Sequence, residues 1–416
     1  MSEATMRDRS EAPVNPFDVS RPELYAEDRW QEPFRKLRAE SPIHYVPESG
    51  FGPYWSVTTY KPIVQIEALP KIFSSDSERG GIAISGDPEL FAKYNMREPM
   101  FIAMDPPKHT GQRRTVAPSF GPSEVAAMKA ECAARTGEVL DSLPIGEPFD
   151  WVQRVSIELT TGMLAKIFGF PWEQRHKLTE WSDYGGDVEL IKNPETIELR
   201  LAKMQEMGMA FGMLWQERMA NPGKDLISVM LRSDAMREME PEEFIGNLIL
   251  LIVGGNDTTR NSMSAYAYGL SQFPEERAKL EANPELIPNA VQELIRWQTP
   301  LSHMRRTVTE DTEVDGVKMK AGDKVVMWYL SANRDESIFE DGESIRVDRE
   351  NARRHLSFGY GIHRCVGARV AELQLVTLLE EMAKRRLRAN VIEEPVRVPA
   401  CFVHGYKSLP VELSKY

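Results

Sequence analysis

The sequence predicts a mainly helical protein with a small β part. Helical patterning dominates from about residue 106 to 300, and its breaks fall at prolines. After residue 305 the pattern changes to short β-rich segments, separated by the turn signals Asp315-Gly316 and Ala321-Gly322. The 416 residues contain no internal repeat and no Gly/Ser-rich linker, so we expect one domain over 21–416.

The amino-terminal residues 1–20 predict a flexible or loosely docked arm, because they are polar and interrupted by Pro13 and Pro16. They also lack the apolar core of a secretory signal peptide. The longest strongly apolar stretch, Leu248 to Val253, is far shorter than the roughly 20 residues that cross a bilayer. We therefore expect a cytoplasmic protein without a membrane span, and we expect it to be a monomer.

Two segments precede the helical part. Residues 25–75 mix short β-like runs with helical pieces. Residues 80–104 carry glycines, prolines and apolar residues without a clear period. Such a segment is typical of a long loop over a functional site.

The composition argues against two kinds of chemistry. The formal net charge of −12 argues against general nucleic-acid binding, which needs a basic face, although a local basic patch stays compatible with it. The three cysteines, Cys132, Cys365 and Cys401, lie far apart in the sequence, and a chain without an export signal keeps its thiols reduced. We expect no disulfide.

A long helix is predicted over residues 242–273, which contain no proline. Gly254 and Gly255 lie in its middle, where each costs on the order of 1 kcal/mol relative to alanine. Two explanations are open. Either the helix packs closely against a neighbour there, or it opens locally beside a ligand, with Thr258 offering a hydroxyl that would otherwise bond to its own carbonyls.

Cys365 lies between two spaced glycines and a final helix expected over about 366–387. It could be a buried structural thiol, a nucleophile, a zinc ligand or a thiolate ligand to another metal. Zinc is disfavoured because only His363 lies nearby and no second Cys/His pair exists. The start of a helix and Arg364 would stabilise a thiolate, which is what a thiolate-ligated haem iron requires.

The stretch FGYGIHRCVG, residues 358–367, resembles the Phe-Gly-x-Gly-x-His-x-Cys-x-Gly haem-binding loop of the cytochromes P-450 at every fixed position. This resemblance implies a single haem domain, with a long central helix over the haem and the cysteine loop beneath it. It implies haem b and O2 as cofactors and Cys365 as the iron ligand. Phe358 and Gly359 of the loop, and Gly254 and Gly255 of the helix, would then lie beside the haem.

The sequence Gly-Gly-Asn-Asp-Thr-Thr, residues 254–259, is similar to the oxygen-binding groove of the same family. The resemblance assigns catalytic roles to Asp257 and Thr258. A hydroxyl that holds dioxygen and a carboxylate that relays protons suit a reaction that consumes two protons.

Charged residues at other positions also match the family. Glu293 and Arg296 alone would suggest a surface ion pair. They match the family's Glu-x-x-Arg signature, however, and this implies a buried structural network with an arginine that precedes the haem-binding loop in the sequence. Arg349 is the first candidate for that arginine, and Arg353 is the second. The haem propionates need cationic or donor partners, for which the matching positions are His109, Arg113, Arg306 and His363; taken singly, each could be a solvated surface residue.

No dinucleotide fingerprint and no iron–sulfur cysteine cluster occurs, so the electrons must come from other proteins. The resemblance implies a ferredoxin and its NAD(P)H-dependent reductase. A cationic docking patch could comprise Arg114, Arg364, Arg369 and the run Lys384-Arg385-Arg386, although that run could equally be a solvated helix end.

The segments GPYWSVTTY, TPLSHMRRTVTED and HLSFGYGIHRCVGARVAELQL are similar to bacterial P-450 alkane and fatty-acid terminal hydroxylases. The resemblance implies hydroxylation at the end of medium-chain linear substrates, in a pocket that selects by shape. The substrate-binding residues it implies are Ile102, Leu250, Val253, Leu301, Ser302 and Phe402. The alternatives are a monooxygenase of terpenoids or aromatics, a haem-thiolate sensor without turnover, and a cysteine-nucleophile hydrolase.

Overall fold

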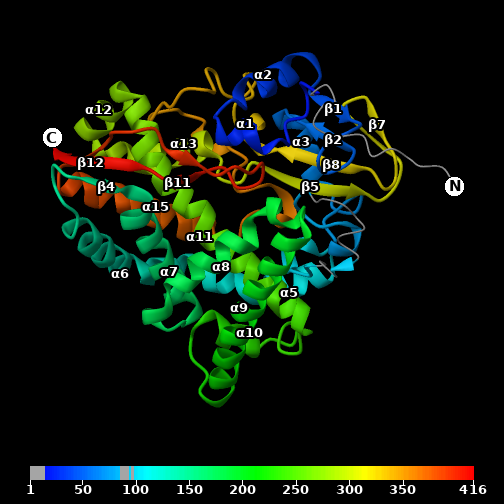
Figure 1. The fold of residues 1–416 in the computed structure, drawn as a ribbon, viewed down its shortest axis with the longest axis horizontal. Helices are drawn as coiled ribbons and strands as arrows, with labels where there is room; N and C mark the ends of the chain where they lie inside the picture. Colours follow the sequence, from blue (N-terminus) through cyan, green and yellow to red (C-terminus); the bar gives the residue numbers. More distant parts are fainter. Residues whose placement is uncertain (1–14, 85–92, 95–97) are drawn as a thin grey trace.

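The computed structural model describes residues 15–84, 93–94 and 98–416. The chain is mostly helical with a smaller β part, as the sequence predicts. Figure 1 shows β1, β2, β5, β7 and β8 together at one side of the fold, with most helices across the centre and the opposite side.

The α-helices are α1 (Pro22–Ala26), α2 (Gln31–Glu40), α3 (Tyr60–Glu67), α5 (Lys108–Val116), α6 (Pro122–Asp141), α7 (Glu158–Phe168), α8 (His176–Gly186), α9 (Pro194–Ala220), α10 (Leu226–Leu231), α11 (Pro241–Gln272), α12 (Pro274–Ala282), α13 (Ile287–Gln298), α14 (Tyr329–Ala332) and α15 (Ala368–Lys384). The strands are β1 (Ile43–Val46), β2 (Tyr54–Val57), β3 (Phe73–Ser74), β4 (Pro148–Asp150), β5 (His303–Val308), β6 (Thr312–Val314), β7 (Val317–Met319), β8 (Lys324–Trp328), β9 (Leu387–Val391), β10 (Val396–Arg397), β11 (Tyr406–Ser408) and β12 (Pro410–Lys415).

The largest sheet has the strand order β1-β2-β8-β5-β3. Strands β2 and β8 are parallel, with Trp55 opposite Val325, and the other pairs are antiparallel. The hairpin predicted at Asp315-Gly316 is present between β6 and β7. Both turn residues have positive φ, 47° and 81°, which is the conformation that an Asp-Gly pair accommodates in such a turn.

The long central helix is confirmed as α11, which is continuous over 32 residues. It packs against α7, α8, α13 and α15. Leu248 and Ile252 in its first half join one hydrophobic cluster, and Met263 and Ala265 in its second half join another. Both halves of the helix are thus buried in the interior of the fold.

The last long helix, α15, is shorter than predicted at both ends. It begins at Ala368, because the chain just before it is the tight loop that carries Cys365. It ends at Lys384, because Leu387 already pairs with β12 as part of β9.

The amino-terminal boundary also differs from the prediction. Val19 is fully buried, and Asp18 accepts hydrogen bonds from the hydroxyls of Ser20 and Tyr54 at 2.6 and 3.1 Å. Residues 15–20 are therefore packed against the domain, and the rest of the predicted arm, 1–14, lies outside the described residues. The same is true of 85–92 and 95–97 within the predicted loop 80–104.

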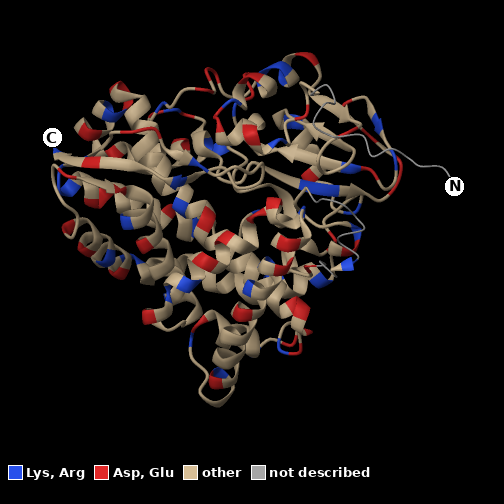
Figure 2. Cartoon of the chain, viewed as in Figure 1, with Lys and Arg blue, Asp and Glu red and all other residues tan. Residues whose placement is uncertain are grey.

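Basic and acidic residues are interspersed along the helices and loops (Figure 2). Within the described parts of the chain, no helix is both long enough and apolar enough to span a membrane.

Candidate functional site

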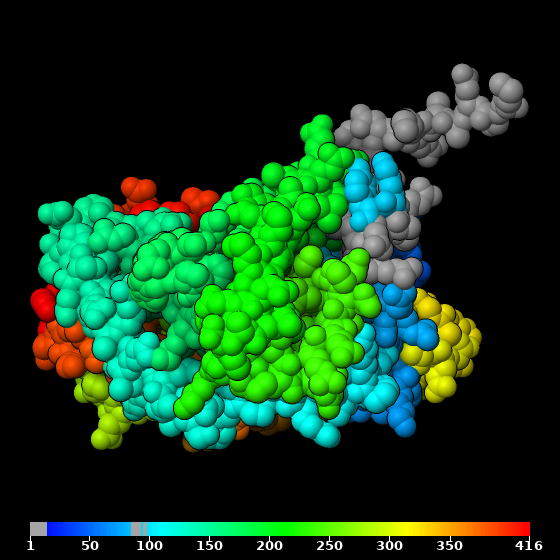
Figure 3. Space-filling model, turned by 90° about the horizontal axis from the view of Figure 1, so that it is seen from below, coloured from blue at the N-terminus to red at the C-terminus, as the bar shows by residue number. Residues whose placement is uncertain are grey.

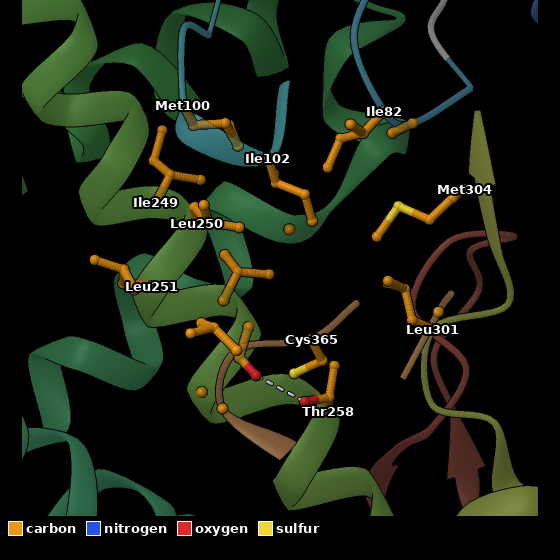
Figure 4. Close-up of a pocket in the computed structure, with 18 of the residues that line it drawn as sticks. Ile82, Met100, Ile102, Ile249, Leu250, Leu251, Thr258, Leu301, Met304 and Cys365 are labelled. Carbon is orange, nitrogen blue, oxygen red and sulfur yellow. Dashed lines mark hydrogen bonds between the residues drawn. The ribbon is translucent and has the colours of Figure 1, made fainter. Parts of the chain in front are cut away.

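An internal cavity of about 300 Å³ lies between α11 and the cysteine loop, residues 358–367. Its other walls come from α8, β5 and the segments around residues 80–84 and 98–103. Figure 4 shows the side chains of Cys365 and Thr258 at one end and apolar side chains, among them Ile102, Leu250 and Met304, along the rest. The cavity therefore joins a small polar end to a long apolar compartment.

The cysteine loop is held in a tight conformation. Gly359 and Gly361 have φ of +67° and +66°, which side-chain-bearing residues rarely adopt, and a Cβ on Gly361 would overlap the carbonyl oxygen of Glu67. The backbone N–H of Cys365 donates to the carbonyl of Phe358 at 2.7 Å. The motif glycines are thus required by the path of this loop.

The Cys365 side chain is exposed, and the space it faces is the cavity rather than the outer surface. Deep placement raises the pKa of its thiol, while the backbone N–H groups of Gly367 and Ala368 and the positive charges of Arg113 and Arg364 act in the opposite direction. The sulfur therefore has donors arranged to hold a negative charge, and a metal cation bound to it would supply the remaining stabilisation.

A buried histidine of the loop, His363, packs against a second buried histidine, His109 of α5. The rings of His109 and His363 have centroids 4.3 Å apart, and none of their four ring nitrogens has a hydrogen-bond partner in the described chain. Burial lowers the pKa of His109 to about 4 and that of His363 to about 2, and nearby arginines act in the same direction. Both rings are neutral at pH 7, so each has one N–H to donate. Unpaired buried donors of this kind point to a missing polar ligand.

Two arginines complete this polar end, and both line the cavity. Arg306 is buried on β5, and Arg113 on α5 donates to the backbone carbonyl of Arg364 in the cysteine loop. His363 also lines the cavity, whereas His109 lies behind it. Three of the four predicted propionate partners therefore face the cavity directly.

Glu67, at the end of α3, is a cavity-lining residue that the sequence interpretation missed. Its carboxylate accepts hydrogen bonds from the Tyr329 hydroxyl at 2.5 Å, the Tyr360 N–H at 2.6 Å and Arg306 at 3.2 Å. Burial raises the pKa of Glu67, and Arg306 opposes this shift. Glu67 thereby ties the cysteine loop to β5, and no motif in the sequence marks it.

These residues fit a haem. A flat cofactor with two carboxylates requires a thiolate donor, cationic or N–H partners for the carboxylates, and backbone that leaves room for the ring. Cys365 supplies the first, and Arg113, Arg306 and the unpaired histidine nitrogens supply the second. The cavity walls at Phe358, Gly359 and Gly254 supply the third, since a Cβ on Gly254 would meet no atom within 4 Å.

The two glycines of α11 have different surroundings. Gly254 borders the open cavity, as the ligand explanation requires, whereas a Cβ on Gly255 would lie 2.6 Å from the Leu164 side chain, as the packing explanation requires. The expectation that the helix opens here is wrong, because α11 is continuous and the Thr258 hydroxyl donates to the Gly254 carbonyl at 2.7 Å. Thr258 nevertheless lines the cavity, and its oxygen can still accept a hydrogen bond from that side.

Asp257 is buried and does not line the cavity, so the predicted acid–alcohol pair is split by the helix. Its carboxylate accepts from Ser182 at 2.8 Å and pairs with Arg260 at 2.9 Å. Burial raises the pKa of Asp257 to about 6, against the effect of Arg260 and with a contribution from the negative charge of Asp183. The carboxyl can therefore change its protonation state near neutral pH.

Five of the six predicted substrate residues line the cavity: Ile102, Leu250, Val253, Leu301 and Phe402. Ser302 is not one of the lining residues, so this prediction is not supported: its N–H donates to the Phe402 carbonyl at 2.8 Å, and its hydroxyl is buried without a partner in the described chain. Further apolar wall residues were not singled out from the sequence, for example Ile82, Met100, Ile249 and Met304.

The predicted Glu-x-x-Arg network is formed with Arg349, and Arg353 takes no part in it. Glu293 and Arg296 make two hydrogen bonds of 2.7 and 2.8 Å, and Arg349 donates to Glu293 at 2.9 Å. All three side chains are buried, and the two arginines also donate to the carbonyls of 333–344. The network pins the chain that leads into the cysteine loop.

The predicted basic patch divides in two. Arg114, Arg364 and Arg369 are exposed near the place where α5 meets the cysteine loop, and none has an ion-pair partner in the described chain. In the run 384–386, Arg385 pairs with Asp141 and Glu381, and Arg386 donates to the carbonyl of Tyr416. That run is an ordinary helix end with its charges largely neutralised.

Comparisons with known proteins agree with this geometry. The model of the family described as Cytochrome P450 matches residues 197–385. The cytochrome P450-153 structure from Novosphingobium aromaticivorans is 56% identical, with a TM-score of 0.91 over 96% of this chain and 100% of that one. The linalool 8-monooxygenase of Pseudomonas putida is 36% identical over 95% of this chain and 98% of that protein. The methyl-branched lipid omega-hydroxylase of Mycobacterium tuberculosis is 31% identical over 97% and 96%, respectively. This chain belongs to the cytochrome P450 family.

Proposed function

We propose that this cytochrome P450 hydroxylates the terminal carbon of medium-chain linear substrates such as alkanes and fatty acids. The overall reaction converts RH, O2, two electrons and two protons into a primary alcohol and water. The observation that carries the proposal is the long apolar compartment that reaches the polar end beside Thr258 and Cys365. The similarity to a protein named as an omega-hydroxylase supports it.

Haem, when bound through Cys365, supplies an iron centre that activates O2 with electrons derived from NAD(P)H. The chain supplies everything else. Arg113, Arg306 and His363 would hold the carboxylates of the cofactor. Glu67 accepts a hydrogen bond from Arg306 and would thereby keep its guanidinium in position.

Thr258 is the hydroxyl that meets the reacting end of the substrate. Because its proton is donated to the Gly254 carbonyl, its oxygen offers an acceptor toward the cavity and can hold a water or another hydrogen-bond donor there. Asp257 does not line the cavity. A proton can therefore pass from its carboxyl into the cavity only through a water or after the side chain rotates away from Arg260. Its pKa of about 6 suits a group that takes up and releases a proton near neutral pH.

The apolar walls select the terminal carbon by shape. A terminal C–H bond is stronger than its neighbours along the chain, so reactivity alone favours subterminal attack. Side chains such as Leu250, Val253 and Leu301 restrict the approach, so that only the chain end reaches the polar end.

Electrons would arrive from a ferredoxin and its reductase. Arg114, Arg364 and Arg369 form an exposed, unneutralised cationic surface near the cysteine loop, and such a surface suits an acidic carrier. Location in the cytoplasm and a monomeric state stay predictions.

The similarity to a protein named as linalool 8-monooxygenase favours a second candidate, a branched terpenoid substrate. Incubation of the holoenzyme with alkanes, fatty acids, primary alcohols and linalool distinguishes the two when products are scored by position. Terminal alcohols from linear chains support the proposal. Preference for linalool, or predominantly subterminal products, overturns it.

A further inference from the structure

One charged side chain, that of Arg200, is buried among the apolar walls of the cavity. Arg200, a residue of α9, is 4% exposed and lines the cavity. Glu98 and Asp187, which lie outside α9, also line the cavity. We call these three residues the head end of the cavity. The green segment that includes α9 crosses the middle of the face shown in Figure 3, so α9 forms part of the outer layer of the fold.

The guanidinium of Arg200 is fixed by the end of a neighbouring helix. Its Nε donates to the carbonyl of Tyr184 and its Nη2 to the carbonyl of Gly185, both at 3.1 Å. These carbonyls belong to the last turn of α8, where a helix has free acceptors and a partial negative charge. The position of the cation is therefore set by backbone and does not depend on a flexible partner.

Its carboxylate partner is held much less firmly. Nη2 pairs with Glu98 at 2.5 Å, but the Glu98 side chain is 31% exposed whereas that of Arg200 is 5% exposed. Glu98 is the more accessible partner, so it can turn toward water when another carboxylate takes its place beside the buried guanidinium. The two N–H groups on Nη1 of Arg200 have no partner in the described part of the chain.

We propose that Arg200 is the anchor for the carboxylate of a fatty-acid substrate, which takes the place of Glu98 on the guanidinium. The inference rests on the proposed function and adds, within its substrate class, a preference for chains with an anionic head. A substrate carboxylate can accept from Nη1 and Nη2 together, which is the favourable two-bond geometry for arginine. Glu98 has to leave the guanidinium when the substrate binds, because Asp187 already places one negatively charged carboxylate at the head end.

Anchoring also explains how terminal attack would be selected. A head fixed at Arg200 sets the depth to which the chain extends along the apolar walls toward Thr258 and Cys365. A chain of matching length then presents its last carbon at the polar end. The competing explanation is that Arg200 and Glu98 only hold the cavity closed, in which case they would not distinguish an acid from its ester.

The test is an optical titration of the haem-loaded protein with dodecanoic acid and with its methyl ester, which has the same chain without the charge. In Arg200→Gln the Kd for the acid should rise about 10- to 100-fold, as expected for loss of charge-assisted hydrogen bonds, while the Kd for the ester changes less than about threefold. In Glu98→Gln the Kd for the acid should fall, because the competing carboxylate is gone. The matched control is Lys203→Gln, on the same helix but paired with Glu180 and Glu206 outside the cavity, and it should change neither Kd.

Equal weakening of acid and ester in Arg200→Gln overturns the anchor and identifies a closing contact. An unchanged Kd for the acid overturns it as well. If Arg200→Gln does not fold, Glu98→Gln decides alone: a Kd for the acid that stays constant or rises contradicts exchange at the guanidinium. Product position from the acid in the unsubstituted protein tests the proposed function separately: predominantly subterminal products there refute terminal hydroxylation whatever the Kd values of the variants are.

Discussion

The cysteine face of the cavity and the α11 face are held by different kinds of contact. On the cysteine face, Glu67 and Glu293 are buried carboxylates that are saturated by fixed donors, and the loop between them has backbone that only glycine accommodates. On the α11 face, Thr258 and Asp257 bond to partners that they could exchange, the Gly254 carbonyl and Arg260. The difference suits the cysteine face to holding the proposed metal ligand in one geometry, and it suits the α11 face to the proposed movement of protons.

Removal of the proposed metal ligand should have the largest effect on activity of all changes on the cysteine face. In Cys365→Ala, product formation should fall by on the order of a thousandfold or more, because no other thiolate of the described chain reaches the cavity. The shifted Soret band of the reduced carbon monoxide complex should disappear as well. The matched control is Cys132→Ala, a buried cysteine that does not line the cavity, and it should retain both. A thiolate-type spectrum in Cys365→Ala would refute the assignment.

Breaking the charge network behind the loop should act on stability. Glu293→Gln leaves Arg296 and Arg349 buried with a neutral partner, which should lower the free energy of unfolding by about 3–5 kcal/mol. Urea unfolding monitored by circular dichroism measures it. Arg353→Gln, at an exposed position outside the network, should change the same quantity by less than about 0.5 kcal/mol. Similar decreases in the free energy of unfolding in both variants would show that the buried network stabilises the fold no more than an exposed arginine does.

Thr258 tests the α11 face. In Thr258→Ala, electron transfer should continue, but the alcohol formed per NAD(P)H should fall about tenfold or more, with hydrogen peroxide released instead. Thr258→Ser keeps the hydroxyl and should recover most of the yield. Fully coupled hydroxylation by the alanine variant would remove Thr258 from the proton path.

Asp257 should give the smallest effect, a pH dependence of stability. Because burial raises its pKa to about 6 in the folded protein, the folded state binds a proton more tightly than the unfolded chain does. The folded protein should therefore gain stability relative to Asp257→Asn as pH falls from about 6 toward 4, and the difference should be constant above about pH 7. Urea midpoints of both proteins at pH 5, 6 and 7 measure this. A relative loss of stability on acidification would contradict the raised pKa.

The same difference explains what the sequence could predict. The cysteine loop and the Glu-x-x-Arg network need particular residues at particular spacings, so short motifs alone identify Cys365, Gly359, Glu293 and Arg296. The long helix and the hairpin at Asp315-Gly316 follow from local patterns for the same reason.

Residues brought together by the tertiary fold could not be found in this way. Glu67 reaches Tyr360 and Arg306 from a distant part of the sequence, and a match of positions does not resolve that Leu301 lines the cavity whereas Ser302 does not. Arg200 did carry a signal, because it occupies the buried row of α9 with Ile197, Met204 and Phe211, where a charge is unexpected. Its cavity partner, Glu98, became apparent only in the folded chain.

Terminal selectivity is tested most directly by the product distribution from dodecane, which has no head group, and dodecanoic acid with the haem-loaded protein, ferredoxin and reductase. The account predicts that 1-dodecanol and 12-hydroxydodecanoic acid predominate, because the apolar walls admit the chain end alone to the space beside Thr258 and Cys365. Predominant hydroxylation one or more carbons from the end, in both substrates, would contradict it.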